Sequence, residues 1–316
     1  MMNWGFLGAG SIAESSLAPA VRATPDAALH SVASRDQERA AALGPEKTYA
    51  TYRDLLADPD VDIVYIALHN SAHREWVEES LRAGKHVVCE KPLTLSAADV
   101  DALTDRAEAS GKILVEAAWN RWHPRTLDME DLLGRGALGK VTHVSAYFDG
   151  PTPAPGNYRL DPTLGGGALY DVGYYAVSAV LAAFGWQRPV VREARQERWS
   201  AESADRMTSF VLDFPCGGTA EVFSGLTGDW IETFTVTGDD GELQLLDRAF
   251  TAGAEASRLT GTSKSTPFTH SYAPIDPYQL MVEAVTAAAR TQDTYLVPLT
   301  QSRAIAQVID EVRARV

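Results

Sequence analysis

A glycine-rich turn near the start of the chain has the residue types that bind a dinucleotide. Gly8, Gly10 and Ala13 form the pattern G-x-G-x-x-A directly after a short apolar run, and a helical pattern begins at Ile12. The first glycine permits a tight turn, the second lets the backbone approach a pyrophosphate, and the helix N-terminus faces the anion. The pattern therefore predicts a dinucleotide site with Gly8, Gly10, Ser11 and Ile12 at the cofactor.

The end of the second apolar run indicates which dinucleotide is bound. An NAD site has a carboxylate there for the ribose 2′-hydroxyl, whereas this chain has Ser34 and Arg35, with Arg39 one helical turn further on. A hydroxyl and guanidinium groups fit a 2′-phosphate, because arginine offers phosphate a bidentate fork. We therefore predict NADP rather than NAD. The alternative interpretation is a solvated helix start with Asp36 as its N-cap.

Two further segments carry groups that handle protons. Lys91 follows the apolar run that ends at Cys89, and open α/β sheets bind ligands at the carboxyl ends of their strands. Asp171 and Tyr175 follow three glycines and are spaced i and i+4, which places a carboxylate and a phenol on one helix face. Each residue also has a structural interpretation: a surface lysine, a charge favoured by the helix dipole, and a packed tyrosine.

The elements that must position these residues follow two patterns. Up to about residue 120, apolar runs alternate with helical patterns, which predicts βαβ units and a parallel sheet. The expected strands there are 4–7, 28–33, 62–68, 86–89 and 113–116, with helices at 12–23, 37–43, 72–83 and 96–111. Beyond residue 120 we expect a mostly antiparallel sheet of strands 141–148, 190–199, 206–214, 219–224, 229–237 and 242–246. The helices expected there are 127–133, 170–184, 278–290 and 301–315, and 262–267 is expected to be a loop.

Charge and composition exclude several classes of partner. The chain has 28 Lys and Arg against 42 Asp and Glu, a formal net charge of −14, with no dense basic run. Such a surface repels nucleic acid and anionic lipid, and no apolar stretch approaches the ~20 residues of a membrane helix. The two cysteines lack metal-site spacing, and His69 with His73 is too few ligands for zinc. We predict no metal, no nucleic acid, no membrane and a cytoplasmic location.

Taken together, the motifs resemble the glucose-fructose oxidoreductase / inositol dehydrogenase (Gfo/Idh/MocA) family. The resemblance rests on the segments 8–13, 65–67, 90–92, 116–124 and 165–175. It implies an α/β protein with a Rossmann parallel sheet in residues 1–120. It also implies an α+β domain in residues 121–316, whose large, open, mostly antiparallel sheet forms a homodimer or homotetramer. The implied cofactor-binding residues are the glycine turn, Ser34, Arg35, Arg39, Ala67, Leu68, Asn70, His73, Glu90, Lys91, Trp119 and Arg121.

The resemblance also implies an activity. Lys91 matches the family's catalytic lysine and Asp171 its substrate-site aspartate, while Tyr175 stands where many members have histidine. Tyrosine at this position is similar to the dihydrodiol dehydrogenases and the NADP-dependent D-xylose dehydrogenases. The segment 157–162 is similar to the same enzymes, and in it we expect Asn157 to bind the substrate. We expect hydride transfer between a sugar or polyol carbon and the nicotinamide. In it Lys91 binds the reacting oxygen and lowers the pKa of Tyr175, which moves the proton, and Asp171 orients the sugar. The alternatives are an NAD-dependent glycosidase and a cofactor-binding regulator.

Overall fold

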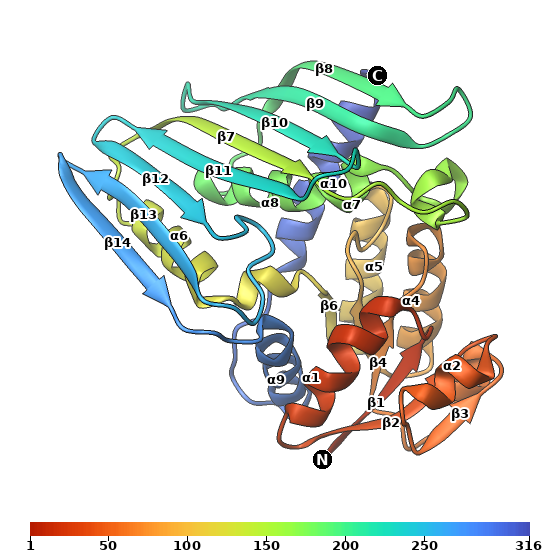
Figure 1. Cartoon of the computed structure of the whole chain (residues 1–316). Coiled ribbons are helices and arrows are strands. Elements are labelled where there is room, and N and C mark those ends of the chain that lie inside the picture. Colours follow the sequence, from red (N-terminus) through yellow and green to blue (C-terminus); the bar gives the residue numbers. More distant parts are fainter. The chain divides into compact units, whose positions relative to one another are not determined.

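The computed structural model describes the whole chain, residues 1–316, as two compact units (Figure 1). One unit contains Met1–Trp119 and Asp276–Ser302, and the other contains Asn120–Ile275 and Arg303–Val316. The sequence led us to divide the chain once, near residue 120, whereas in the structure the segment 276–302 groups with the first unit. None of the helices combines the length and the apolar character that a membrane crossing requires.

The first unit is built on a six-stranded sheet with the order β3-β2-β1-β4-β5-β6, and all its strand pairs are parallel. The central pair, β1 and β4, is buried on both faces over Trp4–Leu7 and Ile63–Ile66, as the continuous apolar runs predict. The order reverses between β1 and β4, so the residues after these strands meet at the switch point where such sheets bind ligands. The strands are β1 Met2–Leu7, β2 Ala27–Ala33, β3 Lys47–Tyr49, β4 Ile63–Ile66, β5 His86–Cys89 and β6 Leu114–Glu116.

The helices of the first unit differ from the expectation in two places. The predicted helix 12–23 opens as a π-helical turn, η1 (Ala13–Leu17), before it continues as α1 (Ala18–Ala23). Pro19 lacks the N–H that a regular helix would need there. We did not predict β3 or the short α3 (Tyr52–Ala57). The remaining helical elements are α2 Gln37–Ala42, η2 Asn70–Ala72, α4 His73–Arg82, α5 Ala97–Ser110, η3 Trp119–Trp122 and α9 Pro277–Ala289.

Helix α9 explains why the end of the chain returns to the first unit. It packs against α1 and η1, and the Thr286 hydroxyl accepts a hydrogen bond of 3.3 Å from Trp4 Nε1. Trp4, Met281, Val282 and Val285 are all fully buried. The apolar face of α9 therefore completes the core beside β1, a tertiary contact that no local pattern reveals.

The second unit is built on an eight-stranded sheet with the order β14-β13-β12-β11-β7-β10-β9-β8 (Figure 1). Only β7 and β10 are parallel, and the other pairs are antiparallel. The loop expected at 262–267 is wrong, because Lys264 and Ser265 form the turn of a hairpin between β13 and β14, both with positive φ. No residue of β14 is buried, so the hydrophobic alternation that marks a strand is missing. The strands are β7 Val141–Asp149, β8 Val190–Arg198, β9 Asp205–Asp213, β10 Thr219–Gly225, β11 Ile231–Gly238, β12 Gly241–Leu246, β13 Ser257–Ser263 and β14 Thr266–Tyr272.

Helices cover one face of this sheet (Figure 1). The helix expected at 170–184 is two helices, α7 (Ala168–Asp171) and α8 (Gly173–Ala183), which join at Val172. Helix α8 packs on β7 and β10. A methyl group on Gly173 would lie 3.1 Å from Ser224 Oγ of β10, so this glycine sits tightly against the sheet. The other helices are α6 Pro124–Gly134 and α10 Leu299–Arg313, which begins in the first unit.

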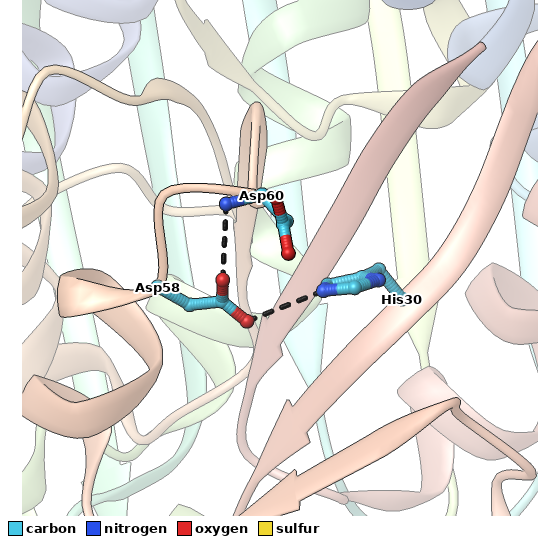
Figure 2. Close-up of side chains that lie close together, drawn as sticks. All are labelled: His30, Asp58 and Asp60. Carbon is cyan, nitrogen blue, oxygen red and sulfur yellow. Dashed lines mark hydrogen bonds and ion pairs between the residues drawn. The ribbon is translucent and has the colours of Figure 1, made fainter.

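A polar network ties β2, β3 and the end of α3 together (Figure 2). The Asp58 carboxylate lies 3.2 Å from His30 Nε2 and accepts hydrogen bonds from Tyr49 Oη at 2.7 Å and Lys47 Nζ at 3.0 Å. Ligand atoms of His30, Asp58 and Asp60 lie within 4.8 Å of one another, a spacing that also suits metal ligands. Lys47 Nζ, however, is only 3.2 Å from Asp60 Oδ2 as well, so the ammonium already supplies the cation that these carboxylates need.

We predict that Asp58→Asn lowers the free energy of unfolding by about 1–3 kcal/mol at pH 7, because it removes the charged acceptor of the buried His30, the half-buried Tyr49 and the exposed Lys47. Burial alone would raise the pKa of Asp58, but hydrogen bonds from Asp60 N, Tyr49, Lys47 and His30 lower it well below the usual range. This stabilisation is therefore full above about pH 4 and is lost as the pH falls further. Urea unfolding at several pH values measures both effects. Asp60→Asn, at an exposed side chain, is the control and should change stability little; equal losses in both variants would contradict the assignment.

Candidate active site

Glycine is required at the two positions of the turn after β1, Gly8 and Gly10, for different physical reasons. A methyl group on Gly8, whose φ is +100°, would lie 2.5 Å from the Ala67 carbonyl oxygen, so β1 and β4 are too close for any side chain there. A methyl group on Gly10 would meet no atom nearer than 3.8 Å. Packing within the protein therefore does not explain Gly10, and its bare backbone leaves open space at the start of a helix. That space fits the pyrophosphate of a dinucleotide.

The end of β2 carries the groups expected to distinguish NADP from NAD. Asp36 is the N-cap of α2, where its carboxylate accepts a hydrogen bond of 3.0 Å from Arg39 N. The capping interpretation of Asp36 is thus confirmed. Arg39 Nη2 donates to the Ala9 carbonyl at 2.6 Å, which brings a guanidinium to the glycine turn. Ser34 lies at the strand end, and the exposed Arg35 follows it. The structure thus brings Arg39 to the glycine turn, and contact of Ser34, Arg35 and Arg39 with a 2′-phosphate stays a prediction.

His73 links the segments that follow β4 and β5. Its Nδ1 lies 2.8 Å from the Pro92 carbonyl oxygen and its Nε2 lies 3.2 Å from that of Leu68. Burial lowers the pKa of His73 to about 4, so the ring is neutral near pH 7. The predicted contact of His73 with a cofactor stays a prediction, because both of its ring nitrogens face backbone of the first unit. In the structure, His73 connects the loop that follows β4 with the loop that follows β5.

Lys91 lies on one of these loops, directly after the buried Glu90. The Tyr65 hydroxyl donates to Glu90 Oε1 at 2.6 Å, and burial raises the pKa of Glu90 despite that bond and the neighbouring charge of Lys91. Glu90 is thus fixed against β4, and its backbone places Lys91 at the carboxyl edge of the sheet. Lys91 is partly exposed, as a lysine that meets a substrate must be.

The two predicted cofactor residues of the block 116–124 fall in different units. Trp119, in the first unit, stacks on Tyr278 of α9 with ring centroids 4.6 Å apart. Arg121, in the second unit, is 2% exposed and forms an ion pair of 2.9 Å with Glu130. Its guanidinium also lies over the ring of Trp186, 4.8 Å from the centroid. Both contacts of Arg121 are internal, but its buried Nε and Nη1 have no hydrogen-bond partner, and its contact with a cofactor stays a prediction.

In the second unit, two of the three glycines before α7 are required by packing within the chain itself. A methyl group on Gly166 would lie 2.5 Å from the Tyr158 carbonyl oxygen, and one on Gly167 would collide with the carboxylate of Asp205. Asp205 Oδ2 accepts a hydrogen bond of 2.9 Å from Leu169 N at the start of α7. In the structure, Gly166 and Gly167 closely approach neighbouring backbone and Asp205, a residue that the sequence analysis did not single out.

Arg159 is the functional candidate that the sequence analysis missed. Its Nε donates to Asp171 Oδ2 at 2.6 Å, and its Nη2 donates to Asp171 Oδ1 at 3.1 Å. Burial acts to lower the pKa of Arg159, but Asp171 outweighs it, and Tyr158 and Tyr175 act in the same direction, so the pKa is raised. Asp171, Arg159 and Tyr175 are thus electrostatically coupled. Only the fold brings Arg159 to α7, so no spacing rule could have found it.

A pocket of about 350 Å³ opens beside this ion pair, entirely within the second unit. One part of its wall is polar and consists of Asn157, Arg159 and Asp171. The structure therefore brings together two of the predicted substrate residues, Asn157 and Asp171. Tyr175 does not line the pocket but is buried beside Phe148, which does. The remaining lining residues are Phe148, Gly150, Pro151, Thr152, Pro153, Ala154, Val172, Leu226 and Trp230.

Two family models match the chain. The model described as the oxidoreductase family with an NAD-binding Rossmann fold matches residues 2–118. The model described as the GFO/IDH/MocA C-terminal domain matches residues 126–244. The matches confirm the resemblance that the motifs suggested, over both halves of the chain.

Named relatives resemble the chain over most of its length. A D-xylose 1-dehydrogenase (NADP(+)) of Haloferax volcanii is 35% identical over 316 residues, covering 98% of this chain and 96% of the relative. A trans-1,2-dihydrobenzene-1,2-diol dehydrogenase of Sus scrofa is 31% identical, covering 78% and 74%. The crystal structure of KijD10, a 3-ketoreductase from Actinomadura kijaniata in complex with NADP and TDP-benzene, superposes with a TM-score of 0.91 and 26% identity, covering 99% of this chain and 97% of that one.

We predict that Gly10→Ala weakens dinucleotide binding by about tenfold or more, because the methyl group enters the space for the pyrophosphate, while thermal stability stays unchanged. Gly8→Ala is the matched comparison. It should destabilise the fold, because its methyl group meets Ala67 at a positive φ. NADPH fluorescence titration and thermal unfolding measure the two effects. Unimpaired NADPH binding by Gly10→Ala would mean that the cofactor does not approach this turn.

Proposed function

Since the chain belongs to the Gfo/Idh/MocA oxidoreductase family, we propose that it is an NADP-dependent dehydrogenase or reductase of neutral sugars or polyols. The observation that carries this proposal is the pocket of the second unit, where Asn157, Arg159 and Asp171 lie together. These groups bind hydroxyls, and the apolar rest of the wall suits the C–H faces of a sugar ring. The D-xylose dehydrogenase among the relatives supports the same substrate class.

The proposed cofactor is NADP. The Ser34 hydroxyl and the Arg35 and Arg39 guanidinium groups support it, since Asp36 is engaged as a helix cap. The names of the Haloferax volcanii relative and of the KijD10 complex both include NADP. When bound, NADP supplies a nicotinamide ring that accepts or donates the hydride. The chain's own task is to bind the phosphates at Gly10 and at the end of β2.

The proposed proton chemistry belongs to Lys91 and Tyr175. Lys91 would bind the reacting oxygen of the substrate through its ammonium N–H, which favours the alkoxide-like charge of the transition state. Tyr175 would carry the proton at its phenol oxygen. A phenol has an ordinary pKa of ~10 and works near neutral pH only with the help of a cation, and we assign that help to Lys91. Tyr175 is 6% exposed as a residue, so most of its side chain is shielded from bulk water.

We further propose that the chain acts in the cytoplasm as a homodimer or homotetramer formed through its large sheet. A hollow lies on β7, β8, β9 and β10 and is lined by residues such as Tyr147, Phe223 and Glu221. Tyr147 and Phe223 stack with ring centroids 4.3 Å apart. A broad sheet face with paired aromatic rings supports a contact between copies.

We predict that Lys91→Ala and Tyr175→Phe each lower kcat/KM by about 10²–10⁴-fold, the usual contribution of a positioned proton-transfer group. Both variants should still bind NADPH. A panel of neutral aldoses and polyols with NADP, followed by nicotinamide absorbance, measures turnover. Lys140→Ala and Tyr147→Phe are matched controls outside the proposed site and should keep wild-type rates. A wild-type protein that turns over no member of the panel would refute the proposed activity, and full activity of either variant would refute that residue's role.

We also predict that Arg35→Ala raises the KM for NADP by about 10- to 100-fold, because a charge-assisted contact with the 2′-phosphate is lost. The KM for NAD should change little, since NAD lacks that phosphate. Steady-state kinetics with both cofactors measure the ratio, and Arg53→Ala, at an exposed position of α3, is the control. An equal increase in the KM for NADP and for NAD would show that Arg35 does not distinguish the cofactors by their 2′-phosphate.

A further inference from the structure

We infer that Trp230 is a substrate-binding residue of the pocket in the second unit, where its indole ring stacks on the C–H face of a cyclic sugar. Two neighbours hold the ring for this contact, Arg248 at one ring face and Glu232 at the ring nitrogen. This inference rests on the proposed function and deepens it, because it assigns the pocket to the ring form of a sugar rather than to an open-chain polyol. No motif of the sequence marks Trp230.

Trp230 is exposed to a degree that packing does not explain. It lines the pocket of about 350 Å³ and is 50% exposed, and no other tryptophan of the chain is among the exposed large hydrophobic residues. Its ring nitrogen donates a hydrogen bond to Glu232 Oε1 within the protein, so the polar end of the side chain is already satisfied. What the residue offers to a ligand is therefore its aromatic surface, which attracts C–H groups through dispersion and through the negative face of the ring.

Arg248 fixes the plane of the indole ring. Its guanidinium carbon lies over the ring of Trp230, 4.7 Å from the centroid, which is the arrangement in which a cation is attracted to an aromatic face. The backbone of Arg248 is fixed in turn. The buried Arg125 donates hydrogen bonds from Nη2 to the Arg248 carbonyl at 2.6 Å and to the Ala249 carbonyl at 3.0 Å. The cation is therefore held over the ring by the fold and not only by its own flexible side chain.

Glu232 joins the indole to the same segment of chain. Its Oε1 accepts the hydrogen bond from Trp230, and its Oε2 accepts hydrogen bonds from Phe250 N at 2.7 Å and Thr251 N at 2.9 Å. The ring of Phe250 stacks on that of Phe148, which lines the pocket, with centroids 5.6 Å apart. One segment thus positions both aromatic rings of the pocket wall, which is the kind of support that a binding residue needs from its neighbours.

The shape of this apolar corner favours a ring. Trp230 and Phe148 lie with ring centroids 6.2 Å apart and planes inclined at 42°, so they form two walls of fixed direction. A cyclic sugar has its C–H groups on a rigid face that can lie against such walls. An open-chain polyol has no fixed face and must lose internal rotations before it can present one, which weakens its binding.

The test is Trp230→Ala, with Trp230→Phe as the conservative variant, on the best cyclic sugar of the panel. We expect Trp230→Ala to raise the KM by about 10- to 100-fold and to leave kcat within about twofold, because the lost contact serves the ground state and the transition state alike. Trp230→Phe keeps an aromatic face, and its KM should stay within about fivefold of wild type. Arg248→Gln removes the cation from the ring and should raise the KM by about two- to fivefold.

The choice between ring and open chain is a readout that a merely structural role would not change. Calorimetric titration of the NADPH-saturated protein compares the cyclic sugar with the open-chain alditol obtained by reducing the same sugar. Wild type should bind the cyclic sugar more tightly. Trp230→Ala should weaken binding of the cyclic sugar more than binding of the alditol, so that the preference falls by about tenfold.

The matched control is Trp76→Ala, which removes a tryptophan that packs edge-on against Tyr52 in the first unit and should leave KM, kcat and the preference unchanged. Equal weakening of the cyclic sugar and the alditol by Trp230→Ala, or a lower kcat at constant KM from a smaller active fraction, would overturn the inference. Binding that depends on Trp230 without turnover refutes only the proposed activity. Turnover that is insensitive to Trp230 refutes only the inference, and absence of both binding and turnover refutes the two together.

Discussion

The packing of Gly166 and Gly167 against their surroundings is the constraint on which the substrate side of this protein depends. Tyr158 and Arg159 can lie directly on these glycines only because no side chain separates the two segments. That contact delivers the Arg159 side chain to Asp171, and Asp205 fixes the beginning of the helix that carries Asp171. One packing requirement thus determines where the polar part of the pocket wall stands. The positions of these pocket residues are therefore set by the packing of backbone against backbone.

The charges of this protein are also balanced locally, by individual ion pairs. The chain is strongly acidic overall, with a net charge of −14, yet its most important carboxylates are compensated locally. Asp58 has Lys47, and Asp171 has Arg159. The group that reaches the glycine turn carries the opposite sign, because Arg39 donates a hydrogen bond to the Ala9 carbonyl. Net charge therefore describes how the protein repels large polyanions, while individual pairs decide what a site accepts.

The features that were predictable from sequence are those that a short stretch of chain determines. The glycine turn and the expected helix 96–111, which the structure contains as α5, each depend on neighbours within a few residues. The features that were not predictable depend on distant partners. Arg159 reaches Asp171 across a loop, β14 pairs without a buried face, and α9 is placed by its contacts with α1 and η1. The sequence therefore located the elements whose structure is local, and it missed the partners that the fold brings in from distant parts of the chain.

Because residues 276–302 return to the first unit, each of the two units is built from two separate segments of the chain. The chain leaves the first unit after Trp119, comes back at Asp276 and leaves again after Ser302. A fragment that stops at residue 120 would lack the helix that buries Trp4 and would expose that apolar surface. The stretch 120–275, by contrast, is an internal cassette with the whole substrate pocket in it. The segment 303–316 also belongs to the second unit, where Arg313 donates a hydrogen bond of 2.6 Å to the Tyr170 hydroxyl. An exchange of the second unit between members of the family would therefore have to include this C-terminal segment.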